Sequence, residues 1–271
     1  MSWGRGGHAT RTGEGWLTGT TVDVRGGGPG TKEIDALDPR NLVPKVEAIV
    51  LTGGSASGLD AASGVMAWLE EQRRGVRVGD PAHVVPVVPA ACVFGLGRGG
   101  DFRARPDAAT GRAAVDAGAA VPEGCVGAGT GATAGPVKGG IGTASTVLDS
   151  GVTVDALVVA NEAGSAVEPG TGALYGELSQ GRVSCPAQDV HRAARLRLAE
   201  IAAKNAPPPP DTALAVVATG ADLPKAQAQK AGTAHDGIAR AVRPVHLLND
   251  GTTVVSVAVA VMSAAPTVAV A

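Results

Sequence analysis

The order of strands and helices that the sequence predicts favours an α/β fold in a single domain. With 271 residues, 44% of them hydrophobic, the chain can bury one sizeable core. The clearest pattern lies in the last quarter of the chain, where a strand over 212–219, a helix over 225–242 and a strand over 252–261 follow one another. Nearer the start, an apolar run at 46–52 precedes helical spacing over 58–74, which repeats the strand–helix order.

The segments between these units predict further elements. Pro86 and Pro89 cannot donate ladder hydrogen bonds, so the Val-rich segment 83–96 predicts an edge strand or an extended wall. The closely spaced glycines of 124–145 predict a loop or a wall of backbone. The other predicted elements are an Ala-rich helix at 106–120, a buried strand at 152–161 and an amphipathic helix at 189–204.

Charge and composition exclude several kinds of partner. A net charge of −2 without a basic cluster argues against nucleic acid. The apolar tail 254–271 is interrupted by serine and proline, so we expect a core strand with a loose end and no membrane partner. The first thirty residues contain no apolar stretch of signal-peptide length, which predicts a cytoplasmic protein. Three widely spaced cysteines, Cys92, Cys125 and Cys185, predict buried, reduced thiols.

Short motifs for common enzyme classes fail on their context. The glycines of 95–100 fit the dinucleotide pattern G-x-G-x-x-G, but no helix start follows them. Segment 54–58, GSASG, has alanine where a nucleophile elbow needs serine. The five histidines lack metal-ligand spacing and predict surface or satisfied polar groups. We therefore expect neither a cofactor nor a metal.

Thr212 stands at a junction that suggests a different chemistry. A proline-rich segment, 206–211, precedes it and predicts an exposed linker, while the strand 212–219 begins with Thr212 itself. A chain cut at this point would leave a threonine whose own α-amine, with a pKa of about 7.7–8.0, can act as its base. The alternative is that Thr212 is simply the polar first residue of a strand.

Long stretches of the sequence resemble one known family over about 22–253. Among them are VDVRGGGPGTKEIDALDP, VEAIVLTGGSASGLDAASGVMAWLEE, VGAGTGATAG, KGGIGTAS, TALAVVATGADLPKAQAQK and AHDGIARAVRPVHLLNDG. These are similar to the DmpA and β-peptidyl aminopeptidase family of self-processing N-terminal-nucleophile hydrolases, which includes the nylon-oligomer hydrolases. The resemblance implies a four-layer αββα sandwich.

The resemblance also implies a set of site residues. The precursor would cut its own Asp211–Thr212 bond into chains 1–211 and 212–271, and Thr212 would then attack the amides of small peptides. Asn161 matches a side-chain donor to the oxyanion. Asp250 and Thr252 match a segment that orients the nucleophile, although Thr252 stands where relatives carry a carboxylate.

Three alternatives to an aminopeptidase remain. Thr212 together with Asp250 fits a nylon-oligomer hydrolase. The loss of the acid at Thr252, with two shortened segments and no final helix, fits an uncleaved, inactive structural or binding relative. A more distant resemblance to ornithine acetyltransferase suggests acetyl transfer. Relatives also suggest a homo-oligomer, a tetramer.

Overall fold

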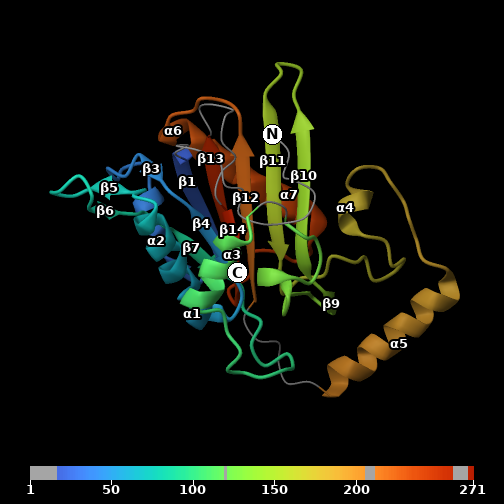
Figure 1. Ribbon diagram of the computed structural model, residues 1–271. Helices are drawn as coiled ribbons and strands as arrows, with labels where there is room; N and C mark the ends of the chain where they lie inside the picture. The colour runs from blue at the N-terminus through green and yellow to red at the C-terminus, as the bar shows by residue number, and fades with distance from the viewer. Residues whose placement is uncertain (1–16, 119–120, 205–210, 259–267) are drawn as a thin grey trace.

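Two β-sheets form the centre of the fold in the computed structural model, which describes residues 17–118, 121–204, 211–258 and 268–271 (Figure 1). The larger sheet has the strand order β10-β11-β12-β13-β1-β3, and the smaller sheet β14-β4-β7-β2. The larger sheet comprises β10 Gly140–Val147, β11 Thr153–Ala160, β12 Asp211–Thr219, β13 Asp250–Ala258, β1 Leu17–Gly26 and β3 Lys45–Val46; the smaller one β14 Val268–Val270, β4 Ile49–Thr52, β7 Ala90–Cys92 and β2 Thr31–Lys32. Two short hairpins join β5 Val76–Arg77 to β6 Val84–Val85 and β8 Thr133–Ala134 to β9 Val137–Lys138.

The main hydrophobic core contains inward-facing side chains of both sheets. Leu51 from β4 belongs to the same buried cluster as Leu157, Leu214 and Val255 from β11, β12 and β13. All four are 1% exposed or less. The alternation of buried and less buried residues along β11 has the period of two expected of a strand with one face in a core.

Helices cover the outer face of each sheet. A second buried cluster joins α2 Ala61–Glu71 and α3 Ala108–Asp116 to β4 and β7 of the smaller sheet. On the larger sheet, α6 Lys225–Ala228, η3 Gln229–Thr233 and α7 Ala234–Ala241 contact β1 or β13. This arrangement confirms the predicted four-layer αββα sandwich. The remaining helices are η1 Ile34–Leu37, α1 Ser55–Gly58, η2 Gly127–Gly129, α4 Tyr175–Leu178 and α5 Gln188–Lys204, of which α5 stands apart from the sheets in Figure 1.

Glycine allows the two helices on the smaller sheet to touch. A Cβ placed on Gly64 of α2 would lie 1.8 Å from the carbonyl oxygen of Ala108, and one on Gly111 of α3 would lie 1.9 Å from that of Ala61. Both helices therefore pack backbone against backbone. In a chain with only 2% aromatic residues, such contacts bring the layers close without large side chains.

Several sequence predictions need correction. β7 lies inside the smaller sheet between β4 and β2, so the prediction of an edge strand in 83–96 is wrong there; Pro86 and Pro89 both precede it. The glycine-rich segment 124–145 contains the start of β10, a regular strand paired with β11. The helix expected over 225–242 is broken into α6, η3 and α7.

Smaller differences concern termini and thiols. The strand expected over 46–52 is regular only from Ile49, and the strand expected to reach 261 is described to Ala258. Within the tail 254–271, β14 is a strand paired with β4, as expected, whereas 259–267 lie outside the described residues. Cys92 is buried, but Cys125 and Cys185 are exposed, so burial was predicted correctly for one thiol of three.

Candidate active site

The predicted nucleophile lies at the start of β12, in the middle of the larger sheet. β12 pairs in parallel with β13, which places Asp211 opposite Asp250 and Thr212 opposite Gly251. Asp211 is 4% exposed and Thr212 3%. The predicted linker at 206–210 lies outside the described residues, but the exposure predicted for Asp211 is wrong because the strand already begins there. The Asp211–Thr212 bond is therefore surrounded by other groups of the protein and not by solvent.

The hydroxyl of Thr212 points back at the peptide bond that precedes it. Its Oγ1 donates to the carbonyl oxygen of Asp211 at 2.7 Å and lies 3.2 Å from the carbonyl oxygen of Gly28. Thr212 Oγ1 is thus close to the carbonyl group that it would attack in self-cleavage. No hydrogen bond joins this hydroxyl to Asp250 or Thr252 among the described residues.

A glycine loop brings the Gly28 carbonyl to Thr212. The amides of Gly27 and Gly28 donate to the carbonyl oxygen of Asp250 at 2.9 and 3.3 Å. Gly26 turns the chain with φ +78°, in the left-handed region that favours glycine. On the other side of the contact, a Cβ on Gly251 would lie 2.5 Å from the carbonyl carbon of Gly28. The position of the Thr212 hydroxyl therefore depends on backbone contacts that side chains would prevent.

Asn161 follows β11 and lies beside Thr212. Its Oδ1 accepts hydrogen bonds from the amide of Thr133 at 3.1 Å and from Arg98 Nη1 at 2.6 Å. Because both donors occupy the oxygen, the Nδ2 group faces Thr212 and donates to its carbonyl oxygen at 3.3 Å. The Asn161 amide group thus contacts the carbonyl of Thr212 and not that of Asp211.

Arg98 is a site residue that the sequence did not reveal. Its guanidinium forms an ion pair with the Asp211 carboxylate and also donates to the carbonyl oxygen of Gly131 at 3.2 Å. The Arg98 side chain is 16% exposed and that of Asp211 5%. Burial raises the pKa of Asp211, and the charge of Arg98 opposes that rise. Arg98 lies in the glycine segment 95–100, whose pattern suggested only a rejected nucleotide motif.

Asp250 and Glu162 form a buried acidic pair close to the same strand end. Asp250 is fully buried and Glu162 is 1% exposed, and their carboxylate oxygens have no hydrogen-bond partner among the described residues. Burial raises the pKa of Glu162 well above its ordinary value, and the Asp250 and Asp211 carboxylates add to the effect. Two carboxyl groups in such a place favour a single shared negative charge.

Thr252 contacts a histidine and not the nucleophile. His246 Nδ1 lies 3.0 Å from Thr252 Oγ1, and the His246 backbone is left-handed with φ 58°. The His246 ring packs edge-on against His235, with 4.8 Å between centroids. Burial lowers the pKa of both histidines, which favours neutral rings. The sequence suggested no role for His246, because its partner is reached only through the folding of the 246–252 turn.

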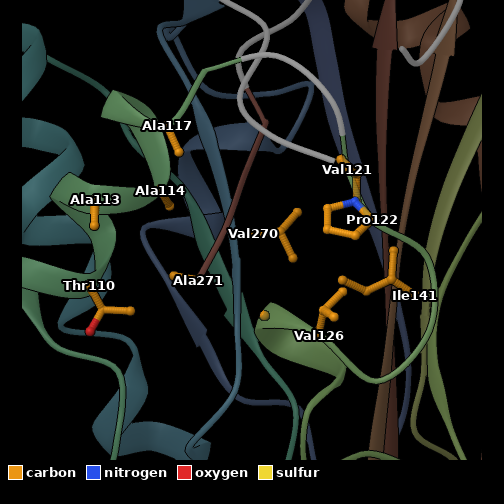
Figure 2. Close-up of a pocket in the computed structure, with 11 residues that line it drawn as sticks. Thr110, Ala113, Ala114, Ala117, Val121, Pro122, Val126, Ile141, Val270 and Ala271 are labelled. Carbon is orange, nitrogen blue, oxygen red and sulfur yellow. The ribbon is translucent and has the colours of Figure 1, made fainter. Parts of the chain in front are cut away.

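Two cavities lie near this part of the fold. One, of about 520 Å³, is lined by the 95–97 segment next to Arg98 and by Gly131. The other, of about 290 Å³, is apolar and lies between α3, η2 and β14, with Val121, Ile141 and Val270 among its lining residues (Figure 2). None of the residues named above at the candidate site lines the apolar cavity.

The described ranges contain neither a cluster of metal-binding side chains nor a membrane-spanning helix. Among those residues no group of three or more His, Cys, Asp or Glu side chains is placed to hold a metal ion. No described helix is both long and apolar enough to cross a bilayer.

Solved structures identify the class of fold. The PH0078 protein of Pyrococcus horikoshii OT3 aligns with a TM-score of 0.61 at 25% identity, covering 90% of this chain and 61% of that one. A β-aminopeptidase of Burkholderia sp. gives 0.61 at 23% identity, covering 94% and 66%. The L-aminopeptidase D-Ala-esterase/amidase of Ochrobactrum anthropi, described as a variant of the N-terminal-nucleophile hydrolase fold, gives 0.59 at 23%, covering 95% and 66%. The chain has this fold, and it spans less than two thirds of the length of these three solved chains.

Sequence comparison identifies the family. The model of peptidase family S58 matches residues 10–270. An uncharacterized aminopeptidase of Mycobacterium tuberculosis is 45% identical over 272 aligned residues, covering 94% of this chain and 77% of the relative. One of Mycobacterium leprae is 43% identical, covering 94% and 74%. The chain belongs to peptidase family S58, which places it among the hydrolases of peptide and amide bonds.

The contact between Gly251 and Gly28 yields a first prediction. Gly251→Ala should destabilise the protein by about 1–3 kcal/mol, because the added methyl group overlaps the Gly28 backbone. The same shift should displace the carbonyl that accepts from Thr212. The measurement is urea denaturation, with Gly142→Ala on β10 as the matched control, because a Cβ there meets no atom within 4 Å. Equal stability of the two variants would contradict the contact.

The acidic pair yields a second prediction. Since the pKa of Glu162 is higher in the folded than in the unfolded chain, the folded state retains a proton that the unfolded state loses above pH about 4.5. The contribution of Glu162 to stability should therefore fall as pH rises above that value. Glu162→Gln should raise the melting temperature relative to wild type at pH 8 and should lose this advantage towards pH 4. A difference that does not change with pH would show that Glu162 has the same pKa in the folded and the unfolded chain.

Proposed function

We propose that the protein is a self-processing aminopeptidase that uses Thr212 as its nucleophile. The observation that carries this proposal is the contact of Thr212 Oγ1 with the Asp211 carbonyl oxygen at 2.7 Å, at the start of the central strand β12. Membership of peptidase family S58 supports the reaction class. The division into chains 1–211 and 212–271 is part of the proposal.

Self-cleavage would begin with attack of Thr212 Oγ1 on the Asp211 carbonyl carbon. The C–N bond then breaks, Asp211 becomes an ester of the Thr212 hydroxyl, and the Thr212 amine is released. Water hydrolyses the ester and leaves Thr212 as a new amino terminus. In turnover, this amine would accept the hydroxyl proton as Oγ1 attacks a substrate amide, and would return it to the departing amine. Water would then hydrolyse the acyl-enzyme ester on Thr212 and release the acid.

Asn161 would supply the oxyanion donor in turnover. Its amide is oriented by Thr133 and Arg98, so it needs no reorganisation of its own side chain to donate. In the uncut chain its Nδ2 contacts the Thr212 carbonyl, so the released amino terminus would have to move for the donor to face an attacked carbonyl.

Thr252 stands where relatives carry a carboxylate, and Glu162 would supply a carboxyl group in its place. It follows Asn161 directly in sequence, and its carboxyl group is close enough to Asp250 for that carboxylate to raise its pKa. Asp250 is opposite Asp211 in the sheet, one residue from the amine that cleavage would release. The single negative charge of the Glu162–Asp250 pair would therefore favour a protonated amine at Thr212 between proton transfers.

An uncleaved, inactive relative is a second candidate. The burial of the Asp211–Thr212 bond and the contact of Thr252 with His246 favour it, because neither prepares an exposed break or an acid beside the hydroxyl. The nylon-oligomer alternative concerns the substrate of the same site. Release of aminohexanoate from a linear oligomer, compared with turnover of an alanine anilide, distinguishes it. A tetramer stays an expectation from the resemblance, and a cytoplasmic location stays an expectation from the first thirty residues.

Denaturing mass spectrometry of the purified protein gives the third prediction. The wild type should yield two fragments, one of which begins at Thr212, and Thr212→Ala should stay intact because it has no hydroxyl to attack with. Thr212→Ser should still be cut, since serine keeps the hydroxyl. A wild-type sample that holds a single full-length mass after long incubation would favour the uncleaved candidate.

Removal of the oxyanion donor gives the fourth prediction. Asn161→Ala should lower kcat for a processed sample by about 10²–10³-fold, the usual effect of losing one such donor. Circular dichroism should show an unchanged fold at the assay temperature. The control is Asn41→Ala, which replaces an exposed asparagine far from Asn161 in the sequence. Unaltered kcat in Asn161→Ala would remove this residue from the mechanism.

A further inference from the structure

The groups that surround Asp211 would form a binding site for the first residue of a substrate. This step rests on the proposed function. If one oxygen, Thr212 Oγ1, attacks both the Asp211 carbonyl in processing and the substrate carbonyl in turnover, the two acyl groups must occupy the same place. After cleavage and departure of Asp211, the groups that held its side chain and its amide would face the amino-terminal residue of a substrate.

Arg98 would keep its place in that vacated site. Its bonds to Asn161 Oδ1 at 2.6 Å and to the Gly131 carbonyl at 3.2 Å involve neither Asp211 nor any residue that cleavage releases at the new chain end. With 16% of its side chain exposed, the guanidinium would lose its only carboxylate partner among the described residues. A buried cation without a partner is costly, so an incoming carboxylate would bind there favourably.

The backbone of Asp211 marks a second point of recognition. Its amide donates to the carbonyl oxygen of Asn249 at 3.1 Å. In a free amino-terminal residue the α-ammonium group would occupy the place of this amide. The Asn249 carbonyl and the nearby Asp250–Glu162 pair would then meet a positive charge, while Arg98 meets a negative one.

We propose that Arg98 forms a subsite for an acidic side chain, so that the preferred substrates are amides and peptides whose amino-terminal residue is aspartate. A side chain of the length of aspartate fits this subsite, because the side chain of Asp211 itself reaches Arg98 directly. The cavity of about 520 Å³ borders the 95–97 segment and Gly131 and offers space next to the Arg98 loop. In the alternative, Arg98 only holds the uncut chain in place.

The test compares p-nitroanilides of L-aspartate, L-asparagine and L-alanine on protein whose cleavage has first been checked by mass. Asparagine has the shape of aspartate without its charge. We expect kcat/KM for aspartate to exceed that for asparagine by about 10- to 100-fold, the factor of one hydrogen-bonded charge pair. In Arg98→Gln this ratio should fall to about one or below. Arg103→Gln, an exposed arginine in the same loop, is the matched control and should keep the wild-type ratio.

A second measurement needs no variant, because Arg98 also holds Asn161 and its replacement affects more than charge. Free L-aspartate should inhibit wild-type turnover at concentrations about 10-fold or more below those of L-asparagine. Cleavage and turnover without a preference for aspartate in either assay would overturn the acidic subsite and leave the proposed function standing. An intact full-length mass with no turnover would instead refute the proposed function, and the subsite with it, because Asp211 would then stay on Arg98.

Discussion

The parallel pairing of β12 with β13 is the constraint on which the site depends. It sets Asp211 opposite Asp250 and Thr212 opposite Gly251, and so aligns the bond to be cut with the turn that follows the last helix of the outer layer. The glycine loop at 26–28 can close on this pair of strands because Gly251 leaves its backbone uncovered. Within the described residues, the Thr212 hydroxyl makes its hydrogen bonds with backbone that this arrangement positions.

Charge is concentrated at the same strand end to a degree that a buried core rarely tolerates. The Asp250 and Asp211 carboxylates both raise the pKa of Glu162, and Arg98 is paired with Asp211. Such a cluster contributes little to net stability, because removing each charge from water offsets most of the attraction between them. Perturbed titration of this kind, next to a candidate nucleophile, is typical of functional sites.

Sequence patterns predicted the layers well and the site in part. The strand–helix–strand order at the end of the chain, and the motifs around Thr212 and Asn161, are local in sequence and were read from it. Arg98 was missed because it reaches Asn161 and Asp211 only when the 95–100 loop folds against them. Glu162 follows the predicted Asn161, but its closeness to Asp250 arises only in the folded chain. The prediction of a loop or a wall of backbone at 124–145 failed for a physical reason. β10 is the end strand of the larger sheet, where it pairs with β11 and tolerates residues without side chains.

The strands after Thr212 are divided between the two sheets, since β12 and β13 lie within the larger sheet and β14 pairs with β4 in the smaller. A cut before Thr212 would therefore leave two chains that each contribute strands to both sheets. Folding would become a bimolecular reaction, with a melting temperature that rises with protein concentration. Refolding from separated chains would have to join both sheets at once, whereas the uncut precursor folds as one chain. Once the chain has been cut, the processed protein can no longer fold as a single chain. The lifetime of the processed structure would therefore depend on the rate at which it unfolds.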